Sequence, residues 1–130
     1  MAIIKQPAKE VHVAGLYEPI QALTGDSTGV TITNYGITTL VMTTGEGVAA
    51  AQAYTLASPG TVGAHKTILH FNTNSTHELS VTTANKFFGS TKETLTFPIG
   101  STALPAQVQL VAQSSRWAIT SISSTGVTLS

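Results

Sequence analysis

The stretches Gln107-Val-Gln-Leu-Val111 and Arg116-Trp-Ala-Ile-Thr120 alternate polar and apolar residues, and only the short link 112–115 separates them. Side chains two residues apart on a β-strand point to the same face of the sheet. Trp117 and Ile119 therefore share one face, with small or polar residues between them. Two alternating runs joined by a tight link predict a β-hairpin.

The same alternating pattern continues along the chain from residue 25. Short alternating stretches are separated by Gly, Pro, Asn and Ser, at a spacing typical of a sandwich or barrel. We expect two of them, 66–71 and 78–82, to form a hairpin. The fold class predicted for residues 25–130 is all-β, a single antiparallel β-sandwich or jelly-roll-like domain. The further expected strands are 29–34, 37–43, 53–56, 66–71, 78–82, 94–97 and 126–129.

The composition excludes several classes of protein. The chain has 130 residues, 22 threonines and 12 serines, and its 6 basic residues balance its 6 acidic ones. A chain with no basic excess lacks the electrostatic footprint of a nucleic-acid-binding protein. Without cysteine there is no disulfide framework or thiolate metal site. Threonine favours the half-exposed face of a sheet, so we expect a polar but nearly uncharged surface.

The alternation also assigns a core and a surface for self-association. Residues on one face of their strands form the expected core: Leu95, Phe97, Leu110, Trp117 and Ile119. The strand 66–71 carries apolar residues on both faces, which indicates a central strand or a subunit contact. We expect self-association through Ile68 and His70 on its second face, and through Val127 and Leu129 in the terminal strand.

Residues 1–24 form a separate N-terminal arm in this interpretation. They contain two of the five prolines and four of the twelve charged residues. A frayed terminus is one interpretation of this composition. The other is an extended arm that reaches roughly 80 Å and docks on a partner. Its expected capsid-binding anchors, a role that depends on the resemblance given below, are Ile3, Ile4, Val11, Val13 and Leu16.

Few residues suggest chemistry. His70 and His77 flank a predicted turn, so a metal site with Glu78 is conceivable, but solvated histidines on a β-surface are far commoner. Trp117 beside Arg116 is either a sugar platform or, in phase with Ile119, a core residue. We expect no catalytic residue, no metal and no cofactor, and hence no enzyme. The pair Phe87-Phe88 either plugs the end of the sandwich or forms a contact site.

Over residues 50–130 the chain resembles the small β-proteins of tailed bacteriophage virions. The resemblance lies in the succession of Thr-rich strands and Gly/Pro turns. It is carried by Tyr54-Thr-Leu-Ala-Ser-Pro-Gly60, Gly63-Ala-His-Lys-Thr-Ile-Leu69, Thr94-Leu-Thr-Phe97, Val108-Gln-Leu-Val111, Arg116-Trp-Ala-Ile119 and Gly126-Val-Thr-Leu-Ser130. Proteins of this kind serve as capsid decoration (cement) proteins, head fibres and fibre tips, and they are commonly trimers.

The resemblance implies a non-enzymatic capsid decoration protein that stabilises contacts between major capsid subunits. We expect a homotrimer on the outer surface of the virion, assembled in the host cytoplasm, with the major capsid protein as partner and no nucleic acid or membrane. The start of the chain lacks the apolar run of a signal peptide. The alternatives are a head-fibre or tail-fibre/baseplate tip module that binds host surface carbohydrate, and a cellular carbohydrate-binding or adhesin module.

Overall fold

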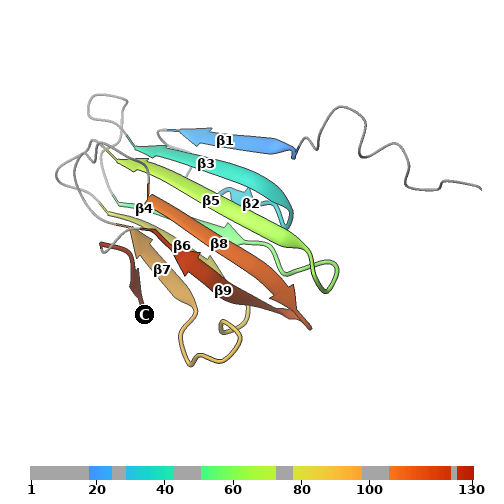
Figure 1. Ribbon diagram of the computed structural model, residues 1–130. Helices are drawn as coiled ribbons and strands as arrows, with labels where there is room; N and C mark the ends of the chain where they lie inside the picture. The colour runs from blue at the N-terminus through green and yellow to red at the C-terminus, as the bar shows by residue number, and fades with distance from the viewer. Residues whose placement is uncertain (1–17, 25–28, 43–50, 73–77, 98–105, 124–125) are drawn as a thin grey trace, which may run out of the picture.

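The computed structural model describes residues 18–24, 29–42, 51–72, 78–97, 106–123 and 126–130 (Figure 1). These residues form ten strands and no helix. The strands are β1 (Ile20–Thr24), β2 (Thr31–Ile32), β3 (Gly36–Met42), β4 (Gln52–Leu56), β5 (His65–Asn72), β6 (Leu79–Thr83), β7 (Thr94–Phe97), β8 (Ala106–Gln113), β9 (Arg116–Ile122) and β10 (Thr128–Leu129).

The strands lie in two sheets of five, which pack as a β-sandwich (Figure 1). Sheet A has the order β1-β3-β5-β8-β9, and sheet B has the order β10-β7-β6-β4-β2. The predicted all-β sandwich is therefore confirmed. Each strand shows one face to the other sheet and one to solvent, as the alternating burial along β4 and β8 shows.

The pairing between strands differs from the expected antiparallel one. From β1 to β6 the chain alternates between the two sheets, so that β1, β3 and β5 run parallel in sheet A. In the same way β2, β4 and β6 run parallel in sheet B. Antiparallel pairing joins β6 to β7, β7 to β10, β5 to β8 and β8 to β9. The parallel pairs arise because each time the chain returns to a sheet, its new strand runs in the same direction as the previous strand of that sheet. The antiparallel pairs made by β7 to β10 then make both sheets mixed.

This winding explains why one predicted hairpin is wrong and another is right. The strands β5 and β6 lie in different sheets, so they do not pair with each other. The strands β8 and β9 do form the hairpin that the sequence predicts. Ser114 in its tight link has a φ of 57°, in the left-handed region that a short reversal requires.

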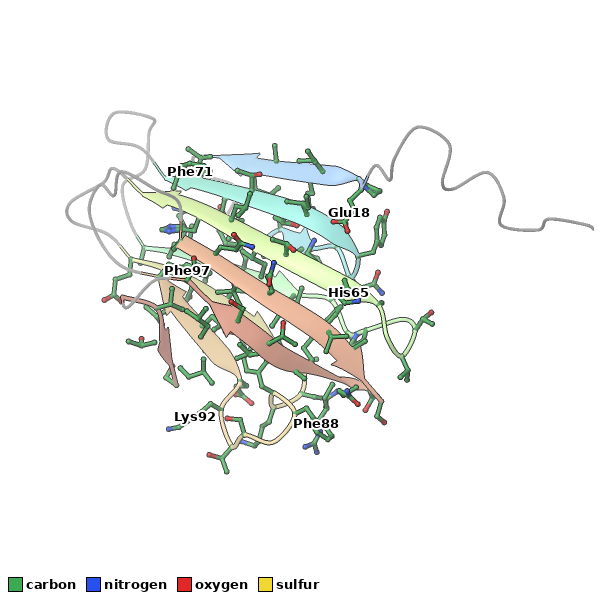
Figure 2. The ribbon with its side chains drawn as sticks, in the orientation of Figure 1. Glu18, His65, Phe71, Phe88, Lys92 and Phe97 are labelled. Atoms are coloured by element: carbon green, nitrogen blue, oxygen red, sulfur yellow. The ribbon has the colours of Figure 1, made fainter. Side chains whose placement is uncertain are left out.

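The core lies between the sheets and contains most of the residues expected there. Leu95, Phe97, Leu110 and Trp117 are buried, and Ile119 is partly buried and packs against them. Phe87 closes one end of the core with 1% of its surface exposed. Its neighbour Phe88 is 54% exposed on the connection between β6 and β7 (Figure 2). Of the two interpretations of this aromatic pair, the plug at the end of the sandwich fits Phe87, and the contact site stays a prediction for Phe88.

The boundary of the arm is also corrected. Residues 20–24, expected in the arm, form β1 and pair with β3 at the edge of sheet A. Ile37 donates its backbone N–H to the Pro19 carbonyl oxygen at 2.9 Å. Gly36 has a φ of 71°, and a Cβ there would overlap that oxygen. The sandwich therefore begins at Pro19, and the arm anchors Ile3 to Leu16 lie outside the described residues.

Candidate interaction surfaces

The disfavoured metal site of His70, His77 and Glu78 would need a hairpin between residues 66–71 and 78–82. His70 lies on β5 in sheet A, whereas Glu78 precedes β6 in sheet B, and His77 is outside the described residues. The hairpin that would have brought them together is absent. Among the residues described, no group of three or more His, Asp or Glu side chains is placed to hold a metal ion.

His70 and Ile68 are corrected as self-association residues. Ile68 has 0% and His70 has 1% of its surface exposed, because this face of β5 looks into the core. The imidazole of His70 lies against the ring of Phe97, with centroids 4.7 Å apart and an interplanar angle of 36°. Burial lowers the pKa of His70 to about 4, so the ring is neutral at pH 7. Neither side chain is accessible to a partner.

The side chains of the terminal segment are only partly available for self-association. Val127 and Leu129, also expected in self-association, are partly buried and pack against the core of their own chain. Leu129 lies opposite Leu95 in the pairing of β10 with β7. Much of the apolar surface of these two side chains is therefore already buried inside the sandwich.

A buried cation, which the sequence did not reveal, lies on the inner side of β5. Lys66 is 1% exposed, and its ammonium donates hydrogen bonds to Thr33 Oγ1 at 3.1 Å, the Tyr35 carbonyl oxygen at 3.0 Å and Thr38 Oγ1. Three acceptors match the three hydrogens of the charged form. Desolvation lowers the pKa of Lys66 to about 8, while Glu18 acts in the opposite direction. This site fixes the turn between β2 and β3 to sheet A.

The outer surface of sheet A carries the most distinctive patch of the described structure. On β1, β3 and β5 the residues that face away from the core include large apolar side chains, although one strand face of a sandwich usually meets water. We call this patch the apolar face. It consists of Ile20, Ile37, Val41, Leu69 and Phe71.

The strand register places four of the five members of the apolar face side by side in pairs. Ile20 lies opposite Ile37, Val41 lies opposite Phe71, and Leu69 lies opposite Thr39. Ile20 is 67% exposed and Phe71 is 39% exposed. Figure 2 shows Phe71 at one end of these strands and Glu18, just before β1, at the other. Lys66 is the only Asp, Glu, Lys or Arg within β1, β3 and β5, and it points inward.

The outer surface of sheet B is different in kind. Four threonines lie side by side across four strands, since Thr55 pairs with Thr31 and Thr82, and Thr82 pairs with Thr94. The hydroxyls of Thr82 and Thr94 share a hydrogen bond of 2.8 Å. A hydroxyl-covered face is well solvated, so the two outer surfaces of the sandwich have opposite character.

The tryptophan is not a sugar platform. Trp117 is 2% exposed and its indole N–H donates to the Ala57 carbonyl oxygen at 2.9 Å. Arg116 beside it is exposed, and a shallow depression next to it is lined by Ser58, Pro59 and Asn85 among others. The ring faces the core, so it presents no open aromatic surface on which a sugar could stack.

Comparison with known protein families and with curated proteins finds no match to this chain. Among the described residues there is no helix of sufficient length and hydropathy to span a bilayer.

Proposed function

We propose that the protein is a non-enzymatic capsid decoration (cement) protein of a tailed bacteriophage, which binds the outer surface of the shell and stabilises contacts between major capsid subunits. In this proposal it acts as a homotrimer. The observation that carries it, through the homotrimer, is the uncharged apolar face of sheet A. Exposed apolar patches of this kind mark protein–protein contacts.

The point at which the arm joins the sandwich supports the proposal. Residues 1–17 precede β1, whose start is fixed to β3 through Pro19 and Gly36. Glu18 stands before Pro19, and a residue before proline favours an extended backbone. A segment of this length spans at most about 60 Å. That reach is sufficient to cross a boundary between neighbouring subunits.

The surface chemistry fits a contact that works at any ionic strength. Apolar contacts and threonine hydroxyls depend little on salt, whereas exposed ion pairs are screened. Many copies around a shell also bind with avidity, so each contact needs only modest affinity. The alternative fibre-tip function needs an exposed stacking aromatic for sugar, and the burial of Trp117 removes the best candidate.

The test is co-sedimentation with empty shells of the major capsid protein encoded by the same phage. The wild-type chain is expected to pellet with the shells and to saturate at a fixed ratio. Replacing the anchors Ile3, Ile4, Val11, Val13 and Leu16 by serine in the full chain is expected to weaken binding strongly. A control variant with Lys5, Lys9 and Glu10 replaced by serine is expected to bind normally. Wild-type protein that stays in the supernatant contradicts the proposal.

A further inference from the structure

We infer that the apolar face of sheet A is the surface through which copies of this chain associate with one another. This inference deepens the proposed function, on which it rests for the expected number of copies. It replaces Ile68 and His70, which lie inside the sandwich, by residues that project from the other side of the same strand and its neighbours. Leu69 and Phe71 are the central pair.

The chemistry of the face favours a second copy as its occupant. Around a symmetry axis the residues nearest the axis meet their own copies, so a charged patch there would repel itself. No Asp, Glu, Lys or Arg projects from β1, β3 or β5 on this side, where His65 is the titratable side chain, and therefore two copies bring no carboxylate, lysine or arginine charge out of water. The hydroxyls of Thr39 and Thr67 lie among the apolar residues, where they can supply hydrogen bonds across the contact.

The position at which the chain enters sheet A also favours a second copy as the occupant of the face. The described chain enters the sheet at Pro19, at one end of the face. The strands β1, β3 and β5 are parallel and all begin at this end. Copies that pack through this face around an axis along the strands would therefore carry the starts of their β1 strands at one common end.

The first test is the mass of the purified full-length protein by light scattering. The wild-type chain is expected at a multiple of 13.5 kDa, and the variant Leu69→Thr/Phe71→Thr at the mass of one chain. The matched control Val62→Thr/Phe88→Thr removes two exposed apolar side chains outside the face, which are 65% and 54% exposed. It is expected to keep the wild-type mass. A cooperative thermal unfolding transition is the check that each variant is folded.

A second measurement works without disturbing the apolar residues. The chain has no cysteine, so single cysteines can be placed at Ala22, exposed on β1 beside the face, and at Ala53, exposed on the outer surface of sheet B. In the oligomer, Ala22→Cys is expected to react with a maleimide several-fold more slowly than Ala53→Cys. The difference is expected to vanish in the Leu69→Thr/Phe71→Thr background.

Two results would overturn the inference. One is a wild-type chain that remains a single copy at high concentration. The other is an oligomer that persists in the Leu69→Thr/Phe71→Thr variant while both cysteines react at equal rates. If the chain then still pellets with shells, the proposed function stands and only the surface is wrong. If it forms the oligomer but never binds shells, the surface stands and the proposed function falls.

Discussion

The indole N–H of Trp117 donates to the carbonyl oxygen of Ala57, 60 residues earlier in the chain, at 2.9 Å. Trp117 is the second residue of β9, an edge strand of sheet A, and Ala57 follows β4 in sheet B. The backbone of Trp117 also accepts a hydrogen bond from Phe88 N at 2.8 Å. One residue thus ties together both sheets and the connection that closes this end of the core.

Trp117→Ala is expected to destabilise the protein by about 3–5 kcal/mol, because it removes a large buried ring and leaves a cavity. Trp117→Phe retains most of the apolar volume and loses the hydrogen bond to Ala57, so we expect a smaller cost of about 1–3 kcal/mol. Chemical denaturation of both variants measures the difference. Equal and negligible costs would show that the ring does not lie in the core.

The sequence predicted this part of the core because period-two alternation is the same in any sandwich. It did not predict the direction of pairing, since a strand such as 66–71 has the same pattern whether its neighbour is parallel or antiparallel. Strand β1 was missed because the prolines and charges of residues 1–24 group it with the arm. The run Ile20-Gln-Ala-Leu-Thr24 directly after Pro19 was the available signal.

The sequence predicted only part of the candidate interaction surface. The apolar character of both faces of β5 indicated a central strand, and the structure places it in the middle of sheet A. The choice of the inner face was wrong for Ile68 and His70, because both faces of β5 carry apolar residues and alternation alone does not show which face meets the other sheet. Lys66 was not recognised as buried, since its acceptors Thr33, Tyr35 and Thr38 are about 30 residues away and only the tertiary fold gathers them.

Lys66 predicts an unusual rise of stability in alkali. Its pKa falls from 10.5 to about 8 on folding, so between these values the unfolded chain binds more protons than the folded one. The free energy of unfolding should therefore increase with pH from about 8 to about 10.5, by up to about 3 kcal/mol relative to Lys66→Met. Urea unfolding of both proteins at pH 7.5 and 10.5 tests this. Parallel pH profiles would refute it.

His70 predicts a loss of stability in acid. Its pKa falls from 6.5 to about 4 on folding, so the unfolded chain takes up the proton first as the pH drops. The free energy of unfolding should decrease between pH 6.5 and 4, by about 3 kcal/mol at the lower end. His70→Leu removes this term and should resist acid better than the wild type. The prediction fails if both proteins lose the same stability over this range.

Gly36 is predicted to control the junction between the arm and the sandwich. Gly36→Ala combines a positive φ with overlap of the Pro19 carbonyl oxygen, so we expect a cost of more than about 2 kcal/mol and faster hydrogen exchange in β1. The control is Gly63→Ala, where φ is 87° and nothing lies within 4 Å of the added Cβ. That variant should cost only about 1 kcal/mol. Equal costs for the two would mean that Pro19 is not fixed against Gly36.

The most direct test of a cement function is the melting temperature of the shell itself. Calorimetry would compare shells of the major capsid protein alone with shells saturated by the wild-type chain. If the protein stabilises contacts between subunits, the shell transition moves to higher temperature, because a ligand that binds only the assembled state stabilises it. A transition that stays at the same temperature with the protein bound would contradict the account, since binding alone does not make a cement protein.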